Sequence, residues 1–546
     1  RANTGNLTVD SNSPAGNVLN VSLGANATLL SSTNVNFNLA GAANEGPITV
    51  TGATGSLVQA PNINYNLGPS DLNIDVGELR GCNNIFGVGG NPTSVGFVTQ
   101  AGIIDFCTPI NTSNPAGNGG NINVVANGGA VNLGGFDVNA NGGGAVGNGG
   151  SINISAAGGI SNGGNITSNG SATGSGNGGA IGLTAPGANN IVVSTLQSGG
   201  GALGGNGGSI TTNSSNLSVT GIGPTGDSIS ASAPNGNGGI ISVTTTSTNP
   251  FVAGSPFPNG TASGIAANGG NGNGGSVIIS SNGAGVLAGV TVSANGSATG
   301  SGGVVTLNAN NPATAFPTIN IAGIVSATGG VPGTGVVGLG TGVGQNLVVN
   351  MTGAGILNAG QQISIGGINP ATGLVSGPPA GNLYVSPYPS GPFPSGPFQT
   401  PLLALNGNLV PPPVPPGGGP VGTTGGSGFN WFAYFLGLAS LQNQVDVQLL
   451  GQRIPTDLTR VLSRRRLNQE LGEEDENEEI ARQKRLGKFC GLIEGSRTYT
   501  SNFDSAEQDR LAMEQIILST DTTSGNNLAL KDGNLLVSPG SSVTVD

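Results

Sequence analysis

Short stretches of alternating apolar and polar residues follow one another along most of the chain. In one stretch Ile122 and Val124 flank Asn123, and in a later one Ile152 and Ile154 flank a polar residue. A period of two predicts half-buried β-strands, because successive side chains of a strand point to opposite sides. Between the strands stand NGG, SNGG and ANG, whose glycines adopt corner conformations at little steric cost.

The alternating stretches belong to a repeat of the form G-N-G-G-x-[I/V]-x-[V/I/L]. It reads GNGGNINV from Gly117, GNGGSINI from Gly147, GNGGAIGL from Gly176, GNGGSITT from Gly205, GNGGIISV from Gly236 and GNGGSVII from Gly272, with weaker copies that begin at Gly300 and end near Leu339. The first apolar position recurs about every 30 residues. These positions form a predicted core ladder of Ile122, Ile152, Ile181, Ile210, Ile241, Val277 and Val305.

One copy of the repeat cannot bury its own apolar side, whereas stacked copies can bury it together. The sequence therefore predicts an all-β fold, a parallel β-helix with about one coil of 30 residues per repeat. Isoleucine and valine would stack inside, and asparagine would form ladders at the corners. A bundle of glycine-rich polyproline helices is the alternative, but it needs glycine at every third position, and this chain lacks that pattern.

Four regions are expected along the chain. Residues 1–116 alternate with less glycine and would begin the solenoid irregularly, and residues 117–376 hold the regular repeats. Residues 377–428 are rich in proline and glycine, which indicates an extended linker or a coat along the rod. Residues 429–546 are expected to form a small mixed α/β region with helices and a β-hairpin.

The C-terminal region differs in charge from the rest. Arg1–Val445 contains two basic and eight acidic residues, whereas the remaining residues include twelve basic and seventeen acidic ones. Its apolar segment Phe429–Leu441 is too short to span a bilayer, which favours a buried helix or a docking segment. The chain ends in an apparent strand, and Val543, Thr544 and Val545 are a candidate for pairing with another subunit.

Composition excludes several classes of function. Histidine is absent and charged residues make up only 7% of the chain, so Ser-His-Asp, Cys-His and HExxH sites cannot form. The net charge of −11 argues against nucleic acid as a partner, because phosphate binding needs a basic surface. No apolar run is long enough for a membrane span. We expect no enzymatic activity, no cofactor and no bound metal.

The three cysteines allow one intramolecular disulfide. Cys82 and Cys107 are separated by about one coil and could face each other across adjacent coils. A disulfide there would suit an oxidising, exported setting. Two buried free thiols fit the spacing equally well, and Cys490 has no evident partner.

The repeats between Gly117 and Leu339, with their interleaved NGG corners, resemble those of large exported β-helix adhesins of the filamentous-haemagglutinin type. The resemblance covers somewhat under half of the chain. It implies an exported fibre that mediates attachment, aggregation or matrix formation, and an extracellular or cell-surface location.

Three functions are consistent with these observations. The first is a structural subunit of an extracellular filament or matrix fibre that polymerises head to tail, because both ends of a solenoid expose unpaired backbone groups. The second is a monomeric surface adhesin that binds a glycan or host surface, with Tyr384–Phe398 as its ligand-facing segment. The third is a β-helix carbohydrate-active enzyme, for which the best carboxylates are Asp71, Asp75 and Glu78 beside Arg80. Solvated turn residues are the simpler interpretation of that cluster.

Overall fold

The computed structural model describes residues 6–11, 18–39, 46–67, 70–87, 91–254, 259–283, 285–310, 316–342, 345–352, 355–369, 375–377, 382–386, 397–400, 402–406 and 408–409. These residues form thirty-nine strands and no helix. The chain divides into two units, Arg1–Thr424 and Gly425–Asp546, and all described residues lie in the first. The predicted C-terminal region, including Val543–Val545, lies outside the described residues.

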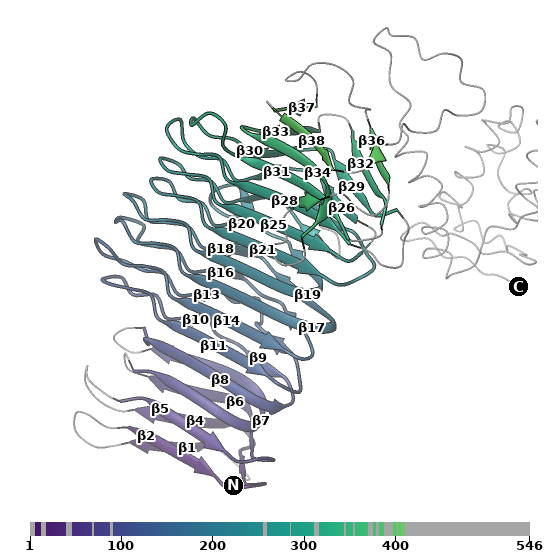
Figure 1. The fold of residues 1–546 in the computed structure, drawn as a ribbon. Helices are drawn as coiled ribbons and strands as arrows, with labels where there is room; N and C mark the ends of the chain where they lie inside the picture. Colours follow the sequence, from purple (N-terminus) through teal and green to yellow (C-terminus); the bar gives the residue numbers. More distant parts are fainter. Residues whose placement is uncertain are drawn as a thin grey trace, which may run out of the picture. The chain divides into compact units, whose positions relative to one another are not determined.

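The strands form a parallel β-helix, which confirms the predicted fold class (Figure 1). A regular coil contributes one strand to each of three ladders. In one such coil these are β11 (Asn121–Ala126), β12 (Val131–Asn132) and β13 (Val138–Asn139). Each strand pairs in parallel with its equivalents in the neighbouring coils, so the ladders form three faces around a common core.

Face 1 is a continuous ladder of fourteen strands and carries the repeat motif. At roughly 4.8 Å per strand its fourteen strands span about 62 Å along the axis. A short antiparallel strand, β35 (Val375–Gly377), pairs with one of them near the C-terminal end. The strands of face 1, in stacking order, are β2 (Leu19–Leu23), β5 (Ile48–Gly52), β7 (Leu72–Gly87), β8 (Ser94–Ala101), β11, β14 (Ser151–Ala156), β17 (Ala180–Val193), β19 (Ser209–Val219), β21 (Ile240–Thr245), β25 (Ser276–Ser281), β28 (Val304–Ala309), β31 (Val336–Thr341), β34 (Gln362–Ile368) and β38 (Leu402–Asn406).

Face 2 follows face 1 in each coil, and the long strands β7, β17 and β19 turn the corner to contribute to both. A corner strand, β3 (Thr28–Leu30), pairs with β6 beside it. The stacking order of face 2 is β1 (Leu7–Ser11), β4 (Asn34–Leu39), β6 (Leu57–Leu67), β7, β9 (Ile104–Phe106), β12, β15 (Ile160–Ser161), β17, β19, β23 (Gly260–Thr261), β22 (Phe251–Ala253), β26 (Gly285–Ala288), β29 (Thr318–Ile321), β32 (Leu347–Met351), β36 (Asn382–Ser386) and β39 (Asn408–Leu409).

Face 3 is a separate ladder of shorter strands that begins with the regular coils. Its strands are β10 (Ile110–Asn111), β13, β16 (Asn165–Thr167), β18 (Thr195–Gln197), β20 (Asp227–Ser230), β24 (Gly264–Ala266), β27 (Val292–Ser293), β30 (Ile324–Ala327), β33 (Ile356–Ala359) and β37 (Phe398–Gln399).

The predicted ladder residues stack in one column inside face 1. Ile122 is in register with Ile152, which is in register with Ile181. All seven predicted ladder residues are at most 2% exposed. The column extends beyond the repeat in both directions and contains Leu19, Ile48, Leu72, Val95, Ile122, Ile152, Ile181, Ile210, Ile241, Val277, Val305, Val337, Ile363 and Leu403.

The GNGG motif forms a corner in which successive coils meet through their backbones. The N–H of Gly149 donates to the carbonyl of Asn177 in the next coil at 2.8 Å, and the N–H of Gly150 donates to the carbonyl of Ala140 at 2.7 Å. A Cβ atom on Gly150 would overlap the carbonyl oxygen of Gly120, one coil below. The corner therefore needs glycine because backbone, and no side chain, fills the space between coils.

The first coils differ from the regular ones in what fills the core. Aromatic rings form a continuous chain there: Phe37 stacks on Tyr65 at 5.5 Å, Tyr65 meets Phe97 edge-on at 5.6 Å, and Phe97 meets Phe106 at 5.0 Å. Burial raises the pKa of the Tyr65 phenol far above its usual range, so this ring stays neutral in the core. Aromatic side chains have the volume to fill coils whose strands are arranged less regularly.

The predicted start of the linker at residue 377 is wrong. β36, β37, β38 and β39 all lie after that residue and pair in parallel with preceding coils. Proline and glycine dominate the stretches between these strands, and the short alternating segments Asn382–Ser386 and Leu402–Asn406 were hidden by that composition. The solenoid therefore continues at least to Leu409.

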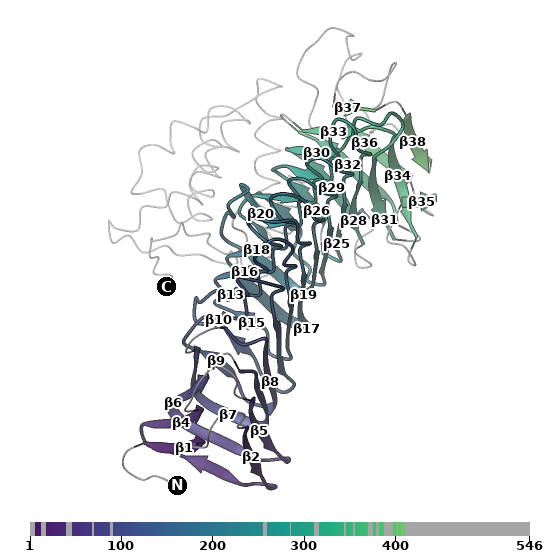
Figure 2. The ribbon, with the colours of Figure 1, turned by 90° about the vertical axis from the view of Figure 1, so that its left-hand side faces the viewer.

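Face 2 contains one strand more than face 1 in the middle of the solenoid. Between β19 and the following regular coil, face 1 has only β21, whereas face 2 has both β23 and β22, paired with each other. The added strand lengthens face 2 by about 4.8 Å relative to face 1. Figure 2 shows the coils beyond β19 leaning relative to those before it, as expected when one side of a stack is longer.

Substitution of Gly150 by alanine should lower the free energy of unfolding by about 2–3 kcal/mol, because the new methyl group must displace the Gly120 backbone. Thermal and urea unfolding would measure the loss. Gly182→Ala is the matched control, since its Cβ would come no closer than 3.5 Å to Asn153. An equal loss in both variants would contradict the packing described for the corner.

A second prediction concerns Thr212, which stands in an apolar column between Leu183 and Val243. Its side chain is 1% exposed, and its hydroxyl has no hydrogen-bond partner. Thr212→Val should therefore raise the free energy of unfolding by about 1 kcal/mol, because a buried unpaired hydroxyl is removed without change of shape. The exposed neighbour Thr211→Val should have little effect in the same unfolding experiment.

Candidate assembly interface

The two ends of the solenoid present strands that are paired on one side only within the described residues. At the N-terminal end β1 pairs only with β4, and β2 only with β5. At the C-terminal end β38 pairs only with β34, and β39 only with β36. Among the described residues, each of these strands therefore has one row of backbone N–H and C=O groups with no strand opposite it.

No further coil of the described residues covers the apolar core at the same two ends. Core residues of the interior coils are buried, whereas the apolar residues that are only partly buried gather mainly in the end coils. An added coil would cover them and remove apolar surface from water. Those of the end coils are Leu7, Val9, Val21, Ala27 and Leu29 at the N-terminal end and Leu403, Leu405 and Leu409 at the C-terminal end.

The face 1 edge strands lack the features that keep strand edges from pairing. β2 reads LNVSL and β38 reads LLALN, so neither contains a charged residue or a proline. Proteins that must avoid edge-to-edge association place lysine, proline or a bulge at such positions. Val18 and Leu402, on the outer side of these edges, are 44% and 53% exposed, which adds apolar surface to both ends.

Asparagine side chains connect consecutive coils at the GNGG corner. The Oδ1 atom of Asn148 accepts the backbone N–H of Asn177 at 2.7 Å, and Asn177 accepts that of Asn206 at 2.7 Å. The same contact joins Asn118 to Asn148, Asn206 to Asn237, Asn237 to Asn273 and Asn273 to Ser301. A ladder of this kind fixes the register of each coil on the next.

A second ladder reaches the N-terminal end on face 2. The Nδ2 atom of Asn62 donates to Oδ1 of Asn34 at 3.0 Å, and Asn34 donates to Asn6 at 3.0 Å. Each amide donates to the residue one coil closer to the N-terminus. Asn6 is the first described residue of this ladder, and by the same pattern its Nδ2 atom would donate to a coil before it.

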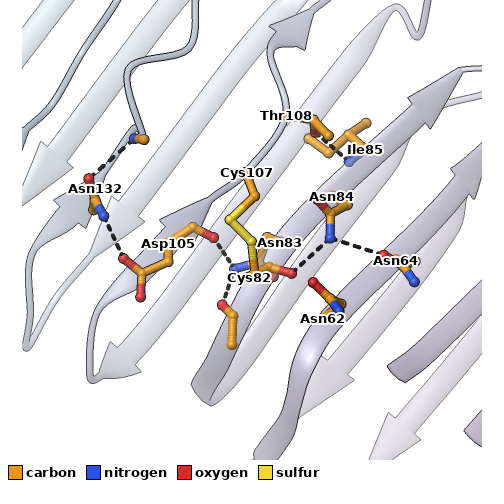
Figure 3. Close-up of a disulfide and its surroundings, with 12 residues drawn as sticks. Asn62, Asn64, Cys82, Asn83, Asn84, Ile85, Asp105, Cys107, Thr108 and Asn132 are labelled. Carbon is orange, nitrogen blue, oxygen red and sulfur yellow. Dashed lines mark hydrogen bonds between the residues drawn. A yellow bond between two sulfur atoms is a disulfide. The ribbon is translucent and has the colours of Figure 1, made fainter. Parts of the chain in front are cut away.

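The structure joins Cys82 and Cys107 in a disulfide across two coils, with Cα atoms 5.6 Å apart (Figure 3). Cys82 follows Asn62 in the asparagine column, so the ladder is interrupted at this step. Next to the disulfide the buried Asn83 accepts a hydrogen bond from Tyr65 at 3.3 Å and donates to the carbonyl of Asp105 at 2.8 Å. The disulfide thus holds two coils together where the amide ladder does not.

Of the carboxylates considered for catalysis, Glu78 and Asp71 form surface contacts and Asp75 is exposed. Glu78 forms a salt bridge with Arg80 at 2.7 Å, and this contact raises the pKa of the guanidinium. Asp71 accepts a hydrogen bond from Thr93 at 2.6 Å, and Asp75 is exposed on the outer side of face 1. Across the described ranges, no three His, Cys, Asp or Glu side chains are placed to hold a metal ion.

The end strands were not singled out by the sequence as interface residues. Leu19 and Leu403 occupy the same column as the repeat ladder, and their alternation looks like that of any interior strand. What distinguishes them is that no described strand lies beyond them, which only the structure shows. Within the described part of the chain we find no helix that could span a lipid bilayer.

Reduction of the disulfide should destabilise the first coils. The cysteines are 25 residues apart, and opening a loop of that length costs about 3 kcal/mol in the chain-entropy model. Hydrogen exchange with and without reductant should show the earliest loss of protection in residues 18–87. A Cys490→Ser variant serves as the control for the third thiol, and uniform loss along the solenoid would contradict the prediction.

Comparisons of the chain with models of protein families, with curated proteins and with solved structures gave no significant match. The resemblance to adhesins of the filamentous-haemagglutinin type therefore stays a prediction from the repeat.

Proposed function

We propose that this protein is a non-enzymatic structural subunit of an extracellular filament or matrix fibre, and that it polymerises head to tail through the ends of its solenoid. The observation that carries the proposal is the core at the two ends of the solenoid, which no further described coil covers. Val21 at one end and Leu403 and Leu405 at the other are only partly buried, although their equivalents in the interior coils are covered. A second copy at each end supplies the missing coil.

The contact between copies is heterologous, because the N-terminal end of one subunit meets the C-terminal end of the next. Such a contact leaves a free end after each addition and generates an open filament. The low charge of Arg1–Val445 supports association, since there is little repulsion between subunits. The surface disulfide is consistent with an oxidising environment outside the cell or at its surface.

A monomeric adhesin is the second candidate, and one observation favours it. Phe316, 49% exposed, meets Tyr384 of β36 with ring centroids 5.8 Å apart. Exposed aromatic side chains are common at binding surfaces, and a glycan is the ligand class we assign to this pair. The rest of the segment Tyr384–Phe398 that was considered for ligand binding is described only in part.

Asn20→Pro tests the filament. The N–H of Leu19 donates to the carbonyl of Pro47 in the next coil at 3.2 Å, so the N–H of Asn20 points to the open edge. Proline at position 20 removes an edge donor without removing a bond inside the solenoid. We expect wild-type protein to form filaments in negative-stain images at physiological salt, and Asn20→Pro to lower filament mass at least tenfold.

The control is Asn20→Ala, which keeps the backbone donor and should polymerise like the wild type. Circular dichroism and thermal unfolding verify that all three proteins are folded. Two results together would favour the adhesin over the filament: wild-type protein that stays monomeric at high concentration, and loss of glycan binding in Phe316→Ala.

A further inference from the structure

We infer the register of the joint between subunits: β2 of one copy pairs in parallel with β38 of the next, with Leu19 opposite Leu403 and Val21 opposite Leu405. This inference rests on the proposed function. It specifies which residues of the two ends meet and therefore how one solenoid continues into another.

The first argument is that both ends carry the same inward column. Leu19 begins the column that runs through every strand of face 1, and Leu403 ends it. A β-strand alternates its sides with a period of two, so a shift by one residue would turn the leucines outward. Stacking with Leu19 opposite Leu403 keeps the apolar residues of both copies inside.

The second argument comes from the outer side of the same strands. Val18 precedes Leu19, and Leu402 precedes Leu403, so the inferred register also places these two residues opposite each other. They are 44% and 53% exposed at separate ends of one rod. A shift by two residues would keep the alternation but would place Val18 opposite Ala404 and leave Leu402 exposed.

The third argument comes from face 2, where the same continuation must hold. In its own subunit β1 lies one coil before β2. If β2 pairs with β38 of the other subunit, β1 therefore lies on face 2 at the level of β39, one strand spacing above β36. Asn6 is the first residue of an outward-facing column on face 2. Followed in register from coil to coil, this column passes through Asn320 and Asn350 and ends at Ser386 of β36. In the inferred joint, Asn6 of one subunit therefore lies above Ser386 of the other. The hydroxyl and carbonyl oxygens of Ser386 can accept a hydrogen bond from the Nδ2 group of Asn6.

The described strands of the two copies do not collide in this arrangement. β39 lies over Asn382 and Leu383 of β36, whereas Asn6 lies over Ser386, three positions further along the strand. One coil of face 2 is thus shared, with β39 from one subunit and β1 from its neighbour. A shared coil fixes the rotation of one subunit about the solenoid axis relative to the next, and also the distance between the two subunits along that axis.

The test is site-specific disulfide formation between two single-cysteine variants. Asn20→Cys and Ala404→Cys, each in a Cys490→Ser background, are prepared separately, mixed, allowed to polymerise and oxidised. Residues 20 and 404 are both on the outer side and face each other in the inferred register, within the Cα separation that a disulfide bridges. We expect disulfide-linked dimers in the mixture on non-reducing gels and at least tenfold fewer in either variant alone.

Leu402→Cys mixed with Asn20→Cys is the matched control. Two residues along the strand and one strand spacing place these Cα atoms about 8 Å apart, which is too far for a disulfide. Filaments that form without a 20–404 link, or that link 20 to 402 instead, overturn the register but leave head-to-tail assembly intact. Absence of filaments from the wild-type protein overturns the proposed function and this inference with it.

Discussion

In-register parallel pairing between consecutive coils is the constraint on which the structure depends. Each residue lies above its equivalent, so every position of the repeat becomes a column with one chemical requirement. Columns that point inward take mostly isoleucine, leucine and valine, with aromatic rings in the first coils. Columns that point outward at the corners take asparagine, whose side-chain amide both donates and accepts. Asn148 does both: its Nδ2 atom donates to Oδ1 of Asn118, and its Oδ1 atom accepts the backbone N–H of Asn177. A column of like charges would repel itself at every step, which accounts for the scarcity of charged residues in this part of the chain.

The same constraint explains why the ends matter more than the sides. Along the faces, each coil pairs its backbone groups with those of the next coil, and exposed large apolar side chains such as Leu203 and Phe316 are scattered. At the ends, the backbone groups and core side chains of β2 and β38 would need a further coil to pair with and to cover them, and the described residues supply none. The proposed association at the ends would therefore extend the fold itself and would need no specialised binding surface.

The sequence was informative where the repeat is regular. The ladder from Ile122 to Val305 could be predicted because each coil there uses the same motif at nearly the same spacing. The coils after Gly377 were missed, since proline-rich stretches between short strands obscure the alternation. The inserted strand of face 2 was missed because the motif marks only the strands of face 1, and β22 and β23 have three and two residues, too few to show alternation. Cys82 and Cys107 were matched by spacing alone, and the choice between a disulfide and two thiols required the positions of their Cα atoms.

The unequal number of strands on faces 1 and 2 has a consequence for any long polymer of this chain. A wedge inserted once per subunit deflects the axis always toward the same side of that subunit. If successive subunits are related by a fixed rotation, the deflections add up to a superhelical path whose pitch depends on that rotation. The two residues of β23 and the three of β22 would then determine the curvature of a fibre many subunits long.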